Sequence, residues 1–462
     1  MSEETKELQA LQKATEEKNL ERFQEISKSL HYVDLAEIYE DLSETHRDFF
    51  TEALGAERFA EVIAEIPDTL VESSLERFDT EDQREILDQV SDDDRVDLLQ
   101  DVSDEAREHL LTLVEPDDID VTRSLLRYGE DTAGGRMTMS FGKVSLEMTI
   151  KQALDSLQKE QGETETLARI YVTDEKDRLI GRLRFRDLAF NKWDTAVKDL
   201  IRPCEHTILA SADQEDAAQI FSKYDLIALP VIDEQDRLLG IITHDDAMEI
   251  IEEESTEDIE KMAGVAGETS EETYLNTTIA THFKRRFPWL LGLAFLAIAS
   301  GYVMLKFEHV LDSLYILSLF LPMVVAAGGN TGGQASTMVI RAMALGELED
   351  GNVKRVAWKE GRLGLLLGSL LGVSMAVITI FILPLFYTTM PDGVTYTQFG
   401  IAVAIALTAQ ITTSTLVGSL LPIGARKVNI DPAIVAAPAI TTIVDVSGMV
   451  IYFFIAKAML LS

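Results

Sequence analysis

Five long stretches with almost no charge occupy the C-terminal part of the chain and constrain its fold more than any other feature. They are residues 287–305, 313–340, 363–390, 393–425 and 432–456. Only the last contains a charged side chain, Asp445. A helix of about 20 apolar residues crosses the hydrocarbon core of a bilayer, so each stretch is long enough to span it. The sequence therefore predicts a multi-pass membrane protein with five transmembrane helices over residues 282–462.

Basic side chains predict how these helices are oriented. They lie before the first stretch, between the second and third, and between the fourth and fifth: Lys284, Arg285, Arg286, Arg341, Lys354, Arg355, Lys359, Arg362, Arg426 and Lys427. Only Lys306 and Lys457 fall on the other side. Basic loops face the cytoplasm of a plasma-membrane protein. We therefore expect a cytoplasmic N-terminus and an extracytoplasmic C-terminus, and the polar first residues lack a signal-peptide core.

Charge is distributed very unevenly along the chain. Residues 1–281 carry a net charge of −41, whereas residues 282–462 carry +3. Binding a phosphate backbone needs a cationic surface, so the acidic part is not expected to bind nucleic acid. It can instead keep the protein soluble, bind a basic partner or attract cations. The single cysteine, Cys204, excludes an internal disulfide and a cysteine-rich metal site.

An internal repeat marks a second region of the chain. Residues 172–187, "VTDEKDRLIGRLRFRD", match residues 231–246, "VIDEQDRLLGIITHDD", at an offset of 59. Each copy reads as a strand, an acidic turn, a second strand and a helix capped by aspartate, with amphipathic helical segments before it. The pattern resembles a pair of cystathionine-β-synthase-type (CBS) domains, small α/β modules that sense ligands for an attached channel or enzyme.

Helical segments flank this repeat on both sides. The preceding ones are short, amphipathic and separated by Asp or Ser caps, which predicts an all-α superhelical N-terminal domain. The segment that follows, "DDAMEIIEEESTEDIEKMAG", is strongly acidic. The predicted domains are an acidic helical domain at 1–130, CBS domains at 131–200 and 201–250, a connecting plug helix at 251–281 and the transmembrane domain at 282–462.

Asp445 is the strongest functional candidate, because lipid offers no partner for a carboxylate. In a helix, Pro438, Thr441, Asp445 and Gly448 fall on one stripe, which is typical of a pore lining or a helix interface. The alternative is a structural aspartate that is hydrogen-bonded to a neighbouring helix.

A second candidate is the polar segment "GGNTGGQ" within an apolar stretch. It comprises Gly328, Gly329, Asn330, Thr331, Gly332, Gly333 and Gln334. Glycines permit close backbone approach or local unwinding beside a water-filled cavity. Tight helix packing through small residues explains the segment as well. The segment "TAQITTSTLVGSLLP" adds Gln410, Thr412, Thr413, Ser414 and Thr415, which suit hydrated contents, although hydroxyls can also bond to their own helix backbone.

The order of these regions, together with "GGNTGGQ" and "NIDPAIVAAPAITTIVDVSG", resembles the MgtE family of magnesium channels over essentially the whole chain. The resemblance implies a homodimer with a pore between its subunits. Asp445 then matches the family's pore carboxylate, and Asp431 matches an acidic residue near the pore mouth. The pore lining would be Gly328, Gly329, Asn330, Thr331, Gln334, Thr441 and Gly448.

The chemistry of Asp445 suits this implied function. Mg²⁺ prefers oxygen ligands at about 2.0 to 2.1 Å and loses its waters reluctantly, so a pore can select the hydrated ion through outer-shell contacts. Two Asp445 carboxylates facing each other would match one divalent ion. Without the ion they would repel by roughly 2 kcal/mol at a separation of about 8 Å and an effective dielectric constant of 20.

The resemblance also implies that the acidic part senses Mg²⁺. Crowded carboxylates oppose closure until Mg²⁺ bridges them, which shifts the population toward a closed state. The implied regulatory ligands are Glu61, Asp93, Asp97, Asp213, Glu215, Asp225, Asp246, Glu252, Glu254, Glu257 and Asp258. Some CBS pairs of the family bind ATP, and "YDLIALPVID" and "THDD" could form such a cleft.

Two departures from the family pattern leave selectivity among Mg²⁺, Mn²⁺, Co²⁺ and Ca²⁺ open. Gly333 stands where many relatives have Asn, and Ala437 stands where a polar residue is common. A proton- or sodium-coupled carrier, with Asp445 as its protonatable site, is an alternative. A membrane-embedded enzyme or receptor is another, but no histidine–acid cluster or nucleophile motif supports an enzyme, so we expect none.

Overall fold

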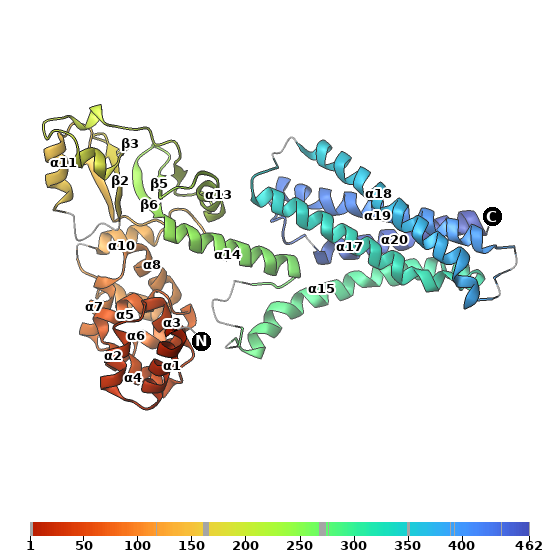
Figure 1. Ribbon diagram of the computed structural model, residues 1–462, viewed down its shortest axis with the longest axis horizontal. Helices are drawn as coiled ribbons and strands as arrows, with labels where there is room; N and C mark the ends of the chain where they lie inside the picture. Colours follow the sequence, from red (N-terminus) through yellow and green to blue (C-terminus); the bar gives the residue numbers. More distant parts are fainter. Residues whose placement is uncertain are drawn as a thin grey trace. The chain divides into compact units, whose positions relative to one another are not determined.

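The computed structural model describes residues 3–116, 118–159, 166–267, 274–275, 277–348, 352–388, 390–391, 393–435 and 437–461 (Figure 1). The chain forms two compact units, which divide between Glu252 and Glu253. The helical N-terminal region, the two α/β modules and the helical C-terminal region predicted from the sequence are confirmed.

The N-terminal part of the first unit consists of short helices. They are α1 (Glu3–Glu16), α2 (Leu20–Ser27), α3 (Tyr32–Glu40), α4 (Glu44–Leu54), α5 (Ala56–Ile63), α6 (Asp68–Leu75), α7 (Thr80–Gln89), α8 (Asp92–Asp101), α9 (Asp104–Leu111) and α10 (Ile119–Leu125). The side chains of Asp79, Ser91 and Ser103 accept hydrogen bonds from backbone N–H groups at the starts of α7, α8 and α9. They are caps of the Asp and Ser type that the sequence predicts between the short helices, and they explain where α7, α8 and α9 begin.

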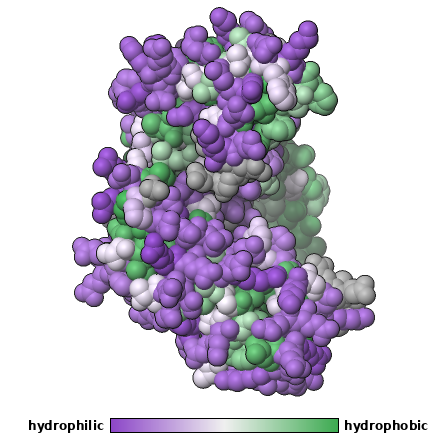
Figure 2. Space-filling model, turned by 90° about the vertical axis from the view of Figure 1, so that its left-hand side faces the viewer, coloured by the Kyte–Doolittle hydropathy of each residue, from purple (hydrophilic) through white to green (hydrophobic). Residues whose placement is uncertain are grey.

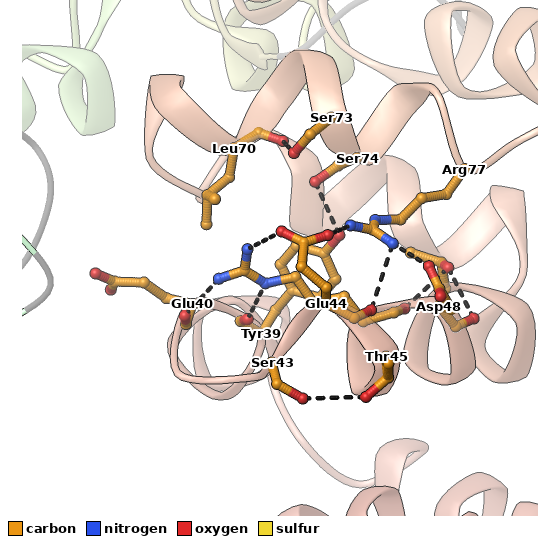
Figure 3. A network of polar contacts seen from close by, with 12 residues as sticks. Tyr39, Glu40, Ser43, Glu44, Thr45, Asp48, Leu70, Ser73, Ser74 and Arg77 are labelled. Carbon is orange, nitrogen blue, oxygen red and sulfur yellow. Dashed lines mark hydrogen bonds and ion pairs between the residues drawn. The ribbon is translucent and has the colours of Figure 1, made fainter.

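Aromatic side chains and one arginine hold these helices together. Tyr39, Phe50 and Phe59 are completely buried, and the centre of the Tyr39 ring lies 5.3 Å from that of Phe50 and 5.4 Å from that of Phe59. Figure 3 shows the adjoining polar network, in which the Arg77 guanidinium bonds to the carboxylates of Glu44 and Asp48. Arg77 thereby ties the end of α6 to α4 with charge-assisted bonds.

The two α/β modules repeat one topology. Their elements are β1 (Phe141–Ser145), α11 (Ile150–Leu157), β2 (Thr166–Thr173), β3 (Leu179–Leu183), α12 (Phe185–Ala189), a 3₁₀ turn (Val197–Asp199), β4 (Ile208–Leu209), α13 (Gln214–Tyr224), β5 (Ala228–Ile232) and β6 (Leu238–Thr243). Each module has a three-stranded sheet, β1-β2-β3 or β4-β5-β6, with one parallel and one antiparallel pair.

The acidic turns of the two repeats bind each other. The backbone N–H of Leu179 donates to the Asp236 carbonyl at 3.0 Å, and that of Leu238 donates to the Asp177 carbonyl at 3.0 Å. Asp177 and Asp236 both have positive φ, of 58° and 61°. The 59-residue repeat therefore forms a pseudo-symmetric pair of modules. Hydrophilic residues cover most of the face of this unit that Figure 2 presents, consistent with its strong negative charge.

Helix α14 (His244–Ala263) leads out of the second module, and the second unit continues from it. The remaining helices are α15 (Ile279–Lys306), α16 (Glu308–Ser313), α17 (Leu317–Ala344), α18 (Val353–Phe381), a 3₁₀ turn (Leu383–Leu385), α19 (Tyr396–Lys427) and α20 (Ala437–Leu460). The spans Ile279–Lys306, Val353–Leu385, Tyr396–Lys427 and Ala439–Leu460 are, among the described residues, long and apolar enough to cross a membrane.

The remaining predicted span, residues 313–340, corresponds to α17, which is not among those four. It is 28 residues long, but "GGNTGGQ" makes its middle polar. Figure 1 shows α17 beside α19 and α20 in a bundle, and Gly328 and Gly332 of α17 are buried there. Protein can therefore cover polar groups that lipid could not solvate.

Glycines let the long helices touch backbone to backbone. A Cβ atom on Gly418 of α19 would lie 2.1 Å from the Gly332 carbonyl oxygen of α17. On α18, a Cβ atom on Gly364 or Gly368 would lie within 3.0 Å of the α19 backbone. Small residues at such spacing are typical of helix association in membranes, where van der Waals contact replaces the hydrophobic effect.

We predict that Gly418→Ala destabilises the second unit by about 1–3 kcal/mol, because the added methyl group overpacks the contact with Gly332. The measurement is the thermal unfolding midpoint of the full chain in detergent. Gly424→Ala is the matched control on the same helix, since a Cβ atom there would meet nothing within 4 Å. Equal midpoints for the two variants would refute the backbone contact.

Candidate functional site

The site around Asp445 is built where α17, α19 and α20 pack together. Gln410 and Ser414 of α19 are completely buried, and the Gln410 Nε2 donates to the Val444 carbonyl at 2.8 Å. A Cβ atom on Gly328 or on Gly448 would lie within 2.5 Å of that Gln410 amide. The two glycines therefore make the space that lets Gln410 reach the backbone next to Asp445.

Asp445 itself is half-buried. Its Oδ1 is enclosed and has no hydrogen-bond partner in the described part of the chain, and it lies 3.9 Å from where a Cβ atom on Gly329 would be. An enclosed carboxylate oxygen without a donor is costly, and in native proteins such a group usually has a function or binds water or an ion.

The structure divides the predicted pore lining into two groups. Asn330, Gln334 and Thr441 are exposed on the surface of this single chain, and Gly329 is partly exposed. Gly328 and Gly448 are buried against Gln410, so in this chain they occupy a helix interface, and the side chain of Pro438 lies outside the described residues.

Helix α17 continues through "GGNTGGQ", so no local unwinding occurs there. The hydroxyl of Thr331 donates to the Ala327 carbonyl of its own helix at 2.9 Å, which is the bond that lets a threonine remain inside an apolar helix. Gly328 and Gly332 pack closely against neighbouring helices, whereas a Cβ atom on Gly333 would meet nothing within 4 Å.

A second group of acids lies in the first unit, where α8 meets the start of α14. Ser91 Oγ lies 2.7 Å from both Asp93 Oδ1 and Asp94 Oδ2, so its single proton can be donated to either carboxylate. Asp246 accepts from the Thr243 backbone N–H at 3.0 Å and is close enough to Asp94 to interact with it electrostatically. Carboxylates from the helical region and the second α/β module thus converge.

Burial and mutual repulsion govern the ionisation of these acids. Burial is the main cause that raises the pKa of Asp94 above its ordinary value, and Asp245 raises it further. Burial likewise raises the pKa of Asp246, with added repulsion from Asp245 and Asp94. Glu65 has a raised pKa for the same two reasons, burial first and then Asp94. The arrangement therefore disfavours full negative charge unless a cation is present.

The other predicted regulatory acids of this unit are more dispersed. Glu61 is exposed on α5, and Asp97 lies 3.8 Å from the Arg136 guanidinium. Asp213 caps the start of α13 beside Glu215, whereas Asp225 follows its last residue. At a rise of about 1.5 Å per residue, Asp213 and Asp225 are roughly 18 Å apart and cannot share an ion within one chain. Glu252 lies on α14 at the end of the unit.

Acids of α14 and of the segment before α20 meet within the second unit. The Lys261 Nζ lies 2.7 Å from Asp431 Oδ2 and also pairs with Glu257. Burial raises the pKa of Asp258, and Asp431 is the next cause. Glu254 lies on the same helix. Across the described residues, no three histidine, cysteine or acidic side chains form a ready metal site, so any ion here needs rearrangement, water or another chain.

A cleft opens between the two α/β modules. It is lined by Arg169, Tyr171, Arg182, Cys204, Glu205, His206, Leu226, Ala228 and Pro230. The last three belong to "YDLIALPVID", one of the two segments predicted to contribute to an ATP cleft. The segment "THDD" does not line this cleft. Thr243 and Asp246 are instead hydrogen-bonded to each other at the start of α14.

Sequence reasoning missed several residues of these sites. Asp94 and Asp245 are next to predicted ligands in acidic runs, and nothing in the sequence says which acid of a run points inward. Lys261 lies in an acidic helix where lysines usually serve solubility. The glycines at 364, 368 and 372 recur every four residues, a spacing that does signal a helix-packing face.

Three family models match this chain. One described as divalent cation transporter matches residues 321–455, one described as MgtE intracellular N domain matches 30–131, and one described as CBS domain matches 197–253. These matches cover the helical region, the second α/β module and most of the long apolar helices.

Similar proteins cover nearly the whole chain. The magnesium transporter MgtE of Thermus thermophilus is 32% identical over 98% of both chains, and that of Bacillus subtilis is 30% identical over 94% of this chain and 93% of its own. A solved structure, the cytosolic domain of the Mg²⁺ channel MgtE in complex with ATP, is 34% identical, with a TM-score of 0.50 over 53% of this chain and 99% of its own. The chain belongs to the MgtE family of magnesium transporters.

Proposed function

We propose that this protein is a Mg²⁺ channel of the plasma membrane that closes when intracellular Mg²⁺ rises, and that it has no enzymatic activity. The unpartnered carboxylate oxygen of Asp445 carries the proposal. An apolar bundle that keeps one such oxygen at a packed helix junction suits the passage of a cation. The excess of basic side chains in alternate loops supports a cytoplasmic N-terminus and an extracytoplasmic C-terminus.

The pore lies between two copies of the chain. Asn330 and Gln334 of α17 are exposed polar side chains, which lipid would leave unsolvated. A second copy against this face would enclose them together with two Asp445 carboxylates. Hydrated Mg²⁺ would then pass by outer-shell contacts with these oxygens, because the ion gives up its water reluctantly.

Intracellular Mg²⁺ closes the channel by neutralising acids in the cytoplasmic part. The convergence of Asp93, Asp94 and Asp246 supports this. Burial first, and then repulsion between neighbouring carboxylates, raises the pKa values of Asp94 and Asp246, and a cation would relieve that repulsion. Ions at Asp213, Glu215 and Asp225 would bridge to another element or to the partner chain. A bound ion stabilises the compact state by its differential affinity for that state.

ATP binds in the cleft between the α/β modules. The relative whose cytosolic domain was solved in complex with ATP supports this, and so does the chemistry of the cleft. Arg169 and Arg182 supply cationic groups for phosphates, and the buried side chains of Tyr171 and Pro230 form part of the cleft's inner wall.

We predict that Asp445→Ala lowers Mg²⁺ flux by at least about tenfold, since the pore loses the charge that balances the ion. Flux of the purified protein in liposomes is the measurement, and Asp312→Ala, an exposed acid after the first membrane helix, is the control. Wild-type conduction by Asp445→Ala would refute the pore assignment. Loss of wild-type uptake on collapsing a proton or sodium gradient would indicate a coupled carrier instead.

Millimolar Mg²⁺ should slow proteolysis of residues 1–281 in the purified full chain, because the ion holds the acidic contacts closed. A potassium salt at equal ionic strength controls for general screening. Asp246→Asn should weaken the protection, whereas Glu105→Gln, at an exposed acid of α9, should leave it intact. Cleavage that is equally fast with and without Mg²⁺ would contradict the sensor.

Protons should compete with Mg²⁺ at this sensor. The pKa values of Asp94 and Asp246 are raised from 3.8, so the folded state binds protons on these carboxyl groups more tightly than the unfolded state does. The stability gained from this protonation is complete below the unfolded pKa and is lost as the pH rises through the folded pKa. Without Mg²⁺, lowering the pH through the raised pKa values of Asp94 and Asp246 toward 3.8 should therefore slow proteolysis. The added protection by Mg²⁺ should shrink over the same range, and a pH-independent Mg²⁺ effect would exclude these carboxylates as its ligands.

A further inference from the structure

Lys261 lies among the acids proposed to bind Mg²⁺ on the connecting helix α14. Its ammonium is 2.7 Å from Asp431 Oδ2 and is also paired with Glu257. Asp258 is close enough to interact electrostatically with both Asp431 and Lys261. Asp431 precedes α20, whereas the other three residues lie on α14. The ammonium therefore bridges two elements that are distant in the sequence.

We propose that Lys261 is an internal counter-ion that occupies this acidic site when no divalent cation is bound and latches α14 to the membrane unit. The inference rests on the proposed closure by Mg²⁺ and deepens it. Mg²⁺ must displace the ammonium to bind between Glu257 and Asp431, so Lys261 determines how far the channel is closed before any ion arrives.

The charges at the site support this exchange. The three carboxylates of Glu257, Asp258 and Asp431 outnumber the one ammonium, so the site keeps a net charge of −2 while Lys261 occupies it. A divalent cation that displaces Lys261 would meet three negative charges and balance more of them than the ammonium does. An ammonium is a compact charge with three donors, so it can bond to two carboxylates at once. Without either cation, the carboxylates of α14 and Asp431 repel each other and separate the helix from its contact.

The latch is more than a surface ion pair. The Lys261 side chain is 26% exposed and that of Asp431 is 31% exposed, so water screens their attraction only in part. A second ion pair, between Arg285 and Glu260, lies one residue before Lys261 on α14. The backbone N–H of Ala266 also donates to the Arg285 carbonyl at 2.9 Å. We expect these contacts to hold α14 in position when Lys261 is replaced, so the substitution tests the ion pair itself.

The two partners of the ion pair should respond differently to mutation. Lys261→Met removes only the counter-ion, so Mg²⁺ flux measured with the cytoplasmic face free of Mg²⁺ should rise by about fivefold, a common size for coupling between sites. Saturating Mg²⁺ at the cytoplasmic face should still close the channel. Asp431→Asn removes a proposed ligand as well, so its flux should rise and resist Mg²⁺. Lys261→Arg should resemble wild type, and Lys192→Met, at an exposed lysine of the first unit, is the charge-matched control.

Hydrogen–deuterium exchange of residues 253–263 in the Mg²⁺-free full chain gives a readout that does not depend on flux. Faster exchange in Lys261→Met than in Lys261→Arg supports the latch, even if wild-type flux proves insensitive to Mg²⁺ and the proposed gating fails. Equal exchange in the two variants overturns the latch. Flux of Lys261→Met that stays high at saturating Mg²⁺ also overturns it, because Lys261 would then be a structural residue that no cation replaces.

Discussion

The close approach of α17 and α19 at Gly332 and Gly418 is the contact on which the membrane unit depends. It brings two helix backbones together where any larger side chain would separate them. Gln410 then reaches across to the Val444 carbonyl on α20 and satisfies a polar group that lipid could not. Asp445 follows Val444 in the sequence, so the same contact fixes where its carboxylate lies.

The two acidic regions follow one electrostatic rule. Burial and mutual repulsion make it unfavourable for neighbouring carboxylates to be charged together, and a nearby cation lowers that free energy. Asp94 and Asp246 meet in the first unit with raised pKa values, and Asp258 and Asp431 meet in the second. Beside Asp258 and Asp431 the chain supplies a cation of its own, because the Lys261 ammonium pairs with Asp431 in the absence of a metal ion.

The fold could largely be predicted from the sequence because its signals are periodic. The 59-residue repeat gave the paired α/β modules, and the uncharged stretches gave the long helices. The predicted span at 313–340 corresponds to helix α17. Because of its polar segment, α17 is not among the four described helices that are long and apolar enough to cross a membrane.

Which side of a helix a residue faces was harder to predict. Thr441 and Gly448 share a stripe, yet Thr441 is exposed and Gly448 is packed against Gln410. Such differences arise from helix rotation, which packing determines and local sequence does not.

The central claim is that two Asp445 carboxylates hold one hydrated divalent ion between two chains. It is tested most directly by anomalous scattering from crystals of the full chain grown with Mn²⁺, an octahedral oxygen-binding ion like Mg²⁺. The account predicts one peak on a two-fold axis between the carboxylates, about 4 Å from their oxygens, as expected for contact through bound water. A map without a peak at Asp445, or an ion held by one chain alone, would contradict it.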